Sequence, residues 1–209
     1  MLIIGAKGLA KEVLNIFHQN GELKGLCFYD DLSTDAPEEL YGEFPVLRNM
    51  EQVKKVFEKD NQFVIGVGNP QLRFTLYNKF KDAGGMLISA ISPLASLGHY
   101  GTTIGQGTII MAGTVISNGV IIGRGCLINP NCTISHDTIL GDFAEISPGV
   151  HITGDCRIGR LTYVGTGAII LPRKVLGDRV IIGAGAVVTK NFGDGLTVAG
   201  VPAKLLNKI

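Results

Sequence analysis

An aliphatic residue recurs at every sixth position through the second half of the chain. Fifteen consecutive members of this series, from Ile104 to Val188, are Ile, Leu or Val. An α-helix would repeat its apolar face with a period near 3.6, and a single half-buried strand with a period of two. The six-residue period instead predicts a coil with flat sides of six residues, each of which points one aliphatic side chain inward. Such coils bury their core only against their neighbours.

Two further periodic features refine this coil. The residue four places after each aliphatic position is mostly small, with Lys174 as the departure. These small positions are Thr108, Thr114, Val120, Cys126, Cys132, Thr138, Ala144, Val150, Cys156, Thr162 and Ala168. Glycine recurs every 18 residues, from Gly105 to Gly177, which indicates three sides per coil. We expect these glycines to form the sharp corners by adopting a positive φ.

Residues 1–85 lack this six-residue repeat, and their pattern predicts strands that alternate with helices. Strands are predicted over 2–4, 25–29 and 62–68, and helices over 9–17 and from about 70 to 83. Alternation of this kind predicts a small parallel sheet with a ligand crevice at the carboxyl ends of its strands. The predicted fold is therefore an α/β domain over 1–85, followed by a parallel β-helix domain over 86–209.

Candidate binding residues follow three of these strands. The turn Gly5-Ala6-Lys7-Gly8 joins a strand to a helix and would present backbone N–H groups to a phosphate, although it could serve only as a turn. Asp30 and Asp31 follow the second strand, where they could bind a ribose or a base, or simply begin a loop. Gly68, at the end of the third strand, completes this candidate substrate-binding set.

Composition excludes several classes of protein. Nineteen Lys and Arg against 18 Asp and Glu give a net charge of +1, which argues against a nucleic-acid partner. The apolar runs are too short to span a bilayer, and no signal peptide is visible. None of the four cysteines has metal-ligand spacing, so we expect no metal. Cys126, Cys132 and Cys156 occupy small core positions, which predicts reduced thiols and a cytoplasmic location.

The repeat, together with the terminal segment Val198-Ala199-Gly200-Val201-Pro202-Ala203-Lys204, resembles the hexapeptide-repeat acyltransferases. The resemblance implies a left-handed β-helix, a homotrimer and acetyl-CoA as the donor. The N-terminal part resembles a narrower group, the sialic-acid O-acetyltransferase-like sugar acyltransferases, which include bacterial UDP-4-amino-sugar N-acetyltransferases. The positions that carry this resemblance are Gly5, Gly8, Lys11, Val13, Asp30 and Asp31. Lys7 and Leu9 stand where that group often has Gly and His, so the exact acceptor stays open.

His136 is the candidate general base. It lies two residues after the aliphatic Ile134, at a predicted corner, and Asp137 follows it. A neutral imidazole can take the proton of an attacking amine or hydroxyl, and Asp137 could orient the ring. Gly154, 18 residues on, could offer an N–H to the oxyanion. The plain alternative is a solvated corner histidine. No nucleophile arrangement for an acyl-enzyme is evident, which favours direct transfer.

The resemblance also implies where acetyl-CoA binds, along the groove between neighbouring prisms. Carried over position by position, it assigns donor contacts to Glu145, Gly154, Thr166 and Ala184, any of which could be repeat scaffolding. The leading hypothesis is N-acetylation of a nucleotide-linked amino sugar for surface-glycan synthesis. O-acetylation of a sugar such as sialic acid, and a non-catalytic trimeric scaffold, are the alternatives. The sequence does not name the sugar or the nucleotide.

Overall fold

The computed structural model describes residues 1–33 and 37–206. The chain divides into two compact units, one of residues 1–68 and 72–90 and the other of residues 69–71 and 91–209. In the part of the chain that is described, no helix has the length and apolar character needed to cross a membrane.

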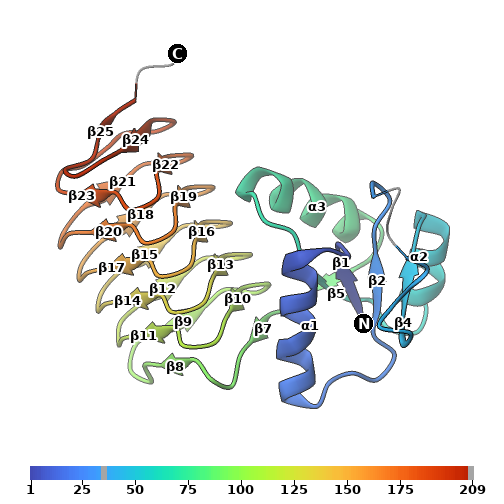
Figure 1. Ribbon diagram of the computed structural model, residues 1–209. Helices are drawn as coiled ribbons and strands as arrows, with labels where there is room; N and C mark the ends of the chain where they lie inside the picture. The colour runs from blue at the N-terminus through green and yellow to red at the C-terminus, as the bar shows by residue number, and fades with distance from the viewer. Residues whose placement is uncertain (34–36, 207–209) are drawn as a thin grey trace. The chain divides into compact units, whose positions relative to one another are not determined.

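The first unit is an α/β domain with one twisted sheet (Figure 1). Its strands are β1 (Leu2–Ile4), β2 (Cys27–Tyr29), β3 (Glu39–Leu40), β4 (Phe44–Leu47), β5 (Gln62–Ile65) and β6 (Met86–Leu87). The helices are α1 (Gly8–Asn20), α2 (Met50–Phe57) and α3 (Pro70–Asp82), of which α3 belongs to this unit from Leu72 onward. The sheet order is β3-β4-β2-β1-β5-β6, and only the edge pair β3–β4 is antiparallel. The parallel sheet predicted from the strand–helix alternation is confirmed.

The predicted helix over 9–17 is longer in the structure and has a defined end. Gly21 takes a left-handed conformation (φ 74°) and donates its N–H to the carbonyls of His18 and Phe17, which is the usual way a glycine terminates a helix. The elements α2, β3, β4 and β6 were not predicted from the sequence pattern. The start of α2 could have been recognised from Asn49, because Asn is a favoured residue at the N-cap of a helix. In the structure the Asn49 side chain accepts a hydrogen bond from the N–H of Gln52.

The second unit is the predicted β-helix, in which short strands stack into three sheets (Figure 1). The stacked strands pair in parallel, and the terminal pair β24–β25 is antiparallel. The first sheet contains β7 (Ala90–Ile91), β10 (Ile109–Ile110), β13 (Leu127–Ile128), β16 (Glu145–Ile146), β19 (Tyr163–Val164), β22 (Ile181–Ile182), β24 (Thr197–Ala199) and β25 (Lys204–Leu205). The second contains β8 (Ser96–Leu97), β11 (Val115–Ile116), β14 (Thr133–Ile134), β17 (His151–Ile152), β20 (Ile169–Ile170) and β23 (Val187–Val188). The third contains β9 (Thr103–Ile104), β12 (Ile121–Ile122), β15 (Ile139–Leu140), β18 (Arg157–Ile158) and β21 (Val175–Leu176).

The core of the β-helix follows the six-residue period. Of the fifteen aliphatic positions, only Ile104 is partly exposed, and the others are buried. The eleven small positions are each 0% exposed, whereas Lys174 is partly exposed. All four cysteines are free thiols in the interior. Burial raises the pKa of Cys132 to about 11, so this thiol is protonated and unreactive at neutral pH.

The expected role of the corner glycines is wrong. Gly105, Gly123 and Gly141 do not have a positive φ. They are required because a Cβ at Gly105 would lie 2.6 Å from the backbone nitrogen of Arg124 in the next coil. The left-handed conformation instead falls two residues later, at every sixth position from Gly107 to Gly185. Even Phe143 (φ 58°) adopts it, although this conformation is costly for a residue with a Cβ.

Candidate active site

The α/β domain holds a pocket of about 300 Å³ at the carboxyl ends of β1, β2 and β5. The three strands are parallel neighbours, so the segments that follow them meet at one edge of the sheet. All seven residues that sequence analysis assigned to the substrate line this one pocket. They are Gly5, Ala6, Lys7, Gly8, Asp30, Asp31 and Gly68.

The glycine turn forms one wall of the pocket. Gly5 has φ 99° and donates its N–H to the carbonyl of Tyr29 at 2.7 Å. A Cβ at Gly5 would lie 2.9 Å from the carbonyl oxygen of Gly66, so only glycine fits there. Lys7 is the N-cap of α1, and its side chain makes no capping hydrogen bond. The first turn of α1 contains no acidic residue, which leaves its positive dipole end suited to an anion.

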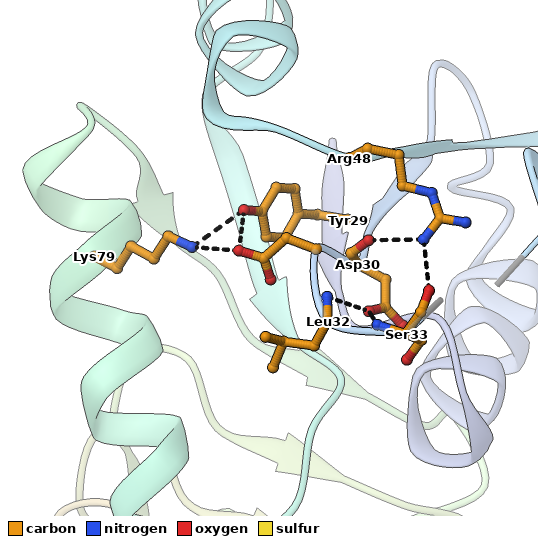
Figure 2. A network of polar contacts seen from close by, with 7 residues as sticks. Tyr29, Asp30, Leu32, Ser33, Arg48 and Lys79 are labelled. Atoms are coloured by element: carbon orange, nitrogen blue, oxygen red, sulfur yellow. Dashed lines mark hydrogen bonds and ion pairs between the residues drawn. The ribbon is translucent and has the colours of Figure 1, made fainter. Parts of the chain in front are cut away.

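Asp30 is buried and holds a loop together. Its Oδ1 accepts hydrogen bonds from the N–H groups of Leu32 (3.1 Å) and Ser33 (2.9 Å). Arg48 donates to the carbonyl oxygens of Asp30 and Ser33, each at 3.0 Å (Figure 2). These contacts are those of an Asp side chain at the start of a loop.

Asp31 is more accessible and belongs to an ionic cluster. Its Oδ2 accepts a hydrogen bond from the Tyr29 hydroxyl at 2.7 Å and another from Lys79 Nζ at 2.9 Å. Burial alone would raise the pKa of Asp31, but these two hydrogen bonds outweigh it and hold that pKa below the usual value. Burial raises the pKa of Tyr29, and its hydrogen bond to Asp31 adds to the shift. Asp31 is therefore an ionised acceptor at neutral pH.

Several pocket residues were missed by sequence analysis. Leu72 and Leu76 of α3 line the pocket from one helix face, and their four-residue spacing was the available signal. Arg73, on the same helix, is fully buried and donates from Nη1 to the carbonyl oxygens of Ile65 (2.8 Å) and Val67 (3.0 Å). It thereby fixes the segment that leads from β5 to Gly68, a role that no local sequence pattern indicated.

The β-helix carries a second candidate site at the corner that follows β14. His136 and Asp137 lie there with side chains 66% and 68% exposed, and His136 Nδ1 is 2.8 Å from Asp137 Oδ2. An ionised carboxylate can only accept, so Nδ1 is the donor in this contact, and in the neutral imidazole Nε2 is then the nitrogen with the lone pair. The two residues border a cavity of about 470 Å³ together with Gly154, Asp155, Pro172 and Arg173.

Gly154 lies one coil beyond His136, directly against the imidazole. A Cβ at Gly154 would be 2.5 Å from Nε2, so any other residue would displace the ring. At other corners an Asp or Asn side chain from the next coil accepts the equivalent N–H, as Asn118 does for Tyr100. The next coil has Pro172 at that place. Accordingly, the Gly154 N–H donates to no group in residues 1–33 and 37–206.

The other predicted donor residues lie elsewhere on the β-helix. Glu145 belongs to β16 of the first sheet, where its buried Oε2 accepts the N–H of Asn69 at 2.9 Å. Thr166 and Ala184 are at equivalent positions of the corner that follows this sheet, after β19 and β22. A single chain therefore brings His136 together with Gly154, but not with Glu145, Thr166 or Ala184.

The remaining histidines offer no comparable arrangement. His18 and His99 are exposed, and His151 Nδ1 is 2.9 Å from the Thr133 hydroxyl. Within the described residues, no three His, Cys, Asp or Glu side chains are grouped so that they could hold a metal ion.

Comparison with known families finds matches in both units. The family described as the PglD N-terminal domain matches residues 1–80, and the bacterial transferase hexapeptide family (six repeats) matches residues 101–136. No curated protein matches the chain.

Solved structures match over nearly the whole length. The acetyltransferase domain of PglB from Neisseria gonorrhoeae, in complex with acetyl coenzyme A, is 33% identical with a TM-score of 0.89, and 98% of each chain is covered. A histidine-to-asparagine variant of perosamine N-acetyltransferase from Caulobacter crescentus, in complex with CoA and GDP-perosamine, is 29% identical with a TM-score of 0.91; 99% of this chain and 96% of that chain are covered. WeeI from Acinetobacter baumannii is 26% identical, with a TM-score of 0.68 and 98% of each chain covered.

Proposed function

The chain belongs to the hexapeptide-repeat sugar acetyltransferases that carry a PglD-type N-terminal domain, and from this premise we propose that it transfers the acetyl group of acetyl-CoA to the amine of a nucleotide-linked amino sugar. The observation that carries the proposal is the match over 98% of both chains to an acetyltransferase domain bound to acetyl coenzyme A. The perosamine N-acetyltransferase complex with a GDP-linked sugar supports the class of acceptor.

His136 is the general base of this proposal. Its Nδ1–H is held by Asp137 at 2.8 Å, which leaves Nε2 to accept a proton from the acceptor nitrogen. The amine attacks the acetyl carbonyl carbon, a C–N bond forms and the thioester C–S bond breaks. The proton collected by Nε2 then neutralises the departing thiolate of CoA. The Gly154 N–H, one coil away, is the donor for the developing oxyanion.

The acceptor nucleotide occupies the pocket of the α/β domain. The Gly5–Gly8 turn and the first turn of α1 offer N–H groups and a positive dipole end to the diphosphate. Asp31 offers an ionised oxygen to hydroxyl or N–H donors of the nucleoside. The apolar side chains of Leu9, Leu72 and Leu76 line the space between these polar groups.

The complete enzyme is a homotrimer with its active sites between subunits. His136 and Gly154 share one corner of the β-helix, whereas Glu145, Thr166 and Ala184 lie on a different sheet and corner. A donor that contacts all of them therefore needs two copies of the chain. Light scattering that finds a monomer of 22.2 kDa at working concentration would rule this assembly out.

The decisive experiment is an acceptor screen. Acetyl-CoA is incubated with UDP-, GDP- and dTDP-linked amino sugars and with the matched sugars that bear a hydroxyl in place of the amine. Released CoA is measured with a thiol reagent, and the product by mass spectrometry. We expect turnover with at least one amino sugar and none with its hydroxyl counterpart. Turnover only with hydroxyl acceptors would contradict N-acetylation, and the absence of any acetyl transfer would contradict the enzymatic function.

A further inference from the structure

Lys79 of α3 reaches the acidic segment that follows β2 and closes a triangle of polar contacts. Its Nζ is 2.9 Å from Asp31 Oδ2 and 3.1 Å from the Tyr29 hydroxyl oxygen. The Tyr29 hydroxyl itself donates to the same Asp31 oxygen at 2.7 Å (Figure 2). Both donors thus meet on one carboxylate oxygen of Asp31, which is also one of the residues that line the pocket.

The triangle is better explained by orientation than by stability. The side chains of Lys79 and Asp31 are 37% and 35% exposed, and ion pairs this accessible to water contribute little to folding. The Lys79 ammonium is nevertheless restrained, because it also lies 5.1 Å from the ring centroid of Tyr29 and 5.7 Å from that of Phe80. The rings of Tyr29 and Phe80 and the Tyr29 hydroxyl therefore restrain the Lys79 ammonium, and the ammonium in turn restrains the Asp31 carboxylate.

The main chain beside Asp31 is fixed from the opposite side. Arg48, which follows β4, donates to the carbonyl oxygens of Asp30 and Ser33 (Figure 2). Asp30 in turn accepts the N–H groups of Leu32 and Ser33. The backbone of Asp31 is thus held by one network and its side chain by another, which is the double support that a precise binding group requires.

We propose that Lys79 is a positioning residue of the acceptor pocket: it orients Asp31 so that the carboxylate accepts hydrogen bonds from the nucleoside of the acceptor. This role rests on the proposed function of the pocket. An ionised carboxylate accepts hydrogen bonds and repels phosphate. Lys79 therefore acts on the nucleoside through Asp31, and its charge is already neutralised by Asp31 and does not serve the diphosphate.

Calorimetric titration with UDP, GDP, dTDP and inorganic pyrophosphate tests this role. Lys79→Met should weaken binding of the best nucleoside diphosphate by about tenfold, the scale of one hydrogen bond to a charged group. Binding of pyrophosphate, which has no nucleoside, should weaken much less, by no more than the repulsion from an Asp31 carboxylate that has lost its neutralising cation. Lys79→Arg should restore most of the affinity. In an Asp31→Asn background, Lys79→Met should have no further effect, because the group that it positions has already lost its charge.

Kinetics and a matched control separate positioning from a structural role. In Lys79→Met we expect a higher KM for the nucleotide sugar and an unchanged KM for acetyl-CoA. Lys81→Met removes a second lysine of α3, which lies over the Tyr77 ring, whereas Lys79 is the lysine that contacts Asp31, and this change should alter neither constant.

Three results would overturn the proposal. If Lys79→Met weakens pyrophosphate as much as the nucleoside diphosphate, Lys79 is a phosphate-binding cation. If it binds nucleoside diphosphates like the wild type, Lys79 has no positioning role. If the wild-type protein binds none of them, the assignment of the pocket fails together with the role of Lys79.

Discussion

The two units of this protein build their candidate sites in opposite ways. In the β-helix the scaffold is a repeat, and the site lies where the repeat changes. His136 stands at a corner, Gly154 one coil later, and Pro172 one coil beyond that, on backbone that is otherwise the same from coil to coil. In the α/β domain no position repeats, and the pocket depends on contacts between segments far apart in sequence, such as Lys79 with Asp31. In the β-helix, single residues of the site can therefore differ from the repeat while the backbone stays the same. In the α/β domain, the shape of the pocket depends on particular side-chain contacts.

The largest effect should come from the residue that departs from the repeat. If His136 is the general base, His136→Ala should lower kcat by about 10²- to 10⁴-fold, the usual contribution of a positioned base. The KM for acetyl-CoA and the thermal midpoint should barely change, since the side chain is 66% exposed. Steady-state kinetics with the best acceptor measures this. His151→Ala, one coil further on and also exposed, is the control and should keep near wild-type turnover. Near wild-type turnover in His136→Ala would return this residue to the status of a solvated corner histidine.

The same contrast explains what the sequence could predict. The β-helix was predictable because one interaction recurs along the whole repeat. An aliphatic side chain packs against the equivalent one in the next coil, as Ile128 does against Ile146, and so regular a pattern does not arise by chance. The seven pocket residues were predictable as a group, since parallel strands bring their carboxyl ends together. The buried contacts of Arg73 and the cation of Lys79 were not, because each joins segments whose spacing follows no period. The prediction of a positive φ at Gly105 failed for the same reason. The 18-residue period correctly placed this glycine at a corner, but glycine is required there because the backbone of the next coil packs close against it.

The next prediction tests whether the two units depend on each other. Ile146 and Ile3 are both 0% exposed, one in the β-helix and one in the central strand β1. Either residue changed to Ala should reduce the free energy of unfolding by about 2–5 kcal/mol, because a cavity remains where the side chain was packed. Denaturant titration measures the loss. Ile3→Ala should also weaken nucleoside diphosphate binding, and Ile146→Ala should leave that binding unchanged. Equal loss of binding in both variants would mean that the pocket depends on the β-helix.

Gly154 offers a smaller and more local change. A Cβ at this position would lie 2.5 Å from His136 Nε2, and the exposed imidazole can move aside more easily than the backbone. Gly154→Ala should therefore lower kcat by about 10²-fold, the scale expected when a catalytic group is displaced by about 1 Å, with little change in thermal midpoint. Gly193→Ala is the matched control, because a Cβ there would meet no atom within 4 Å. A large loss of stability without a selective loss of kcat would instead show that Gly154 serves the packing of coils.

The smallest effect concerns the pH dependence of the Asp31–Lys79 pair. Hydrogen bonds from Tyr29 and Lys79 outweigh burial and lower the pKa of Asp31. Burial would lower the pKa of Lys79, but its hydrogen bonds to Asp31 and Tyr29 prevail and raise it. The contribution of Asp31 is present above its unfolded pKa of about 3.9 and is lost as pH falls through the lower folded value. That of Lys79 is present below about pH 10.4 and is lost as pH rises through the higher folded value. Since both side chains are about one-third exposed, the pair should contribute less than about 1 kcal/mol between these limits.

Urea titration of Lys79→Met and of the wild type at several pH values measures this contribution. The difference in unfolding free energy should be constant between pH 6 and 8, should shrink as Asp31 is protonated in acid, and should be absent from Lys81→Met at every pH. A difference that grows in acid would mean that Lys79 and Asp31 do not stabilise each other. The segment that follows β2 would then be held by Asp30, Arg48 and the Tyr29 hydroxyl without a contribution from Lys79, and the contrast between the two units would be weaker.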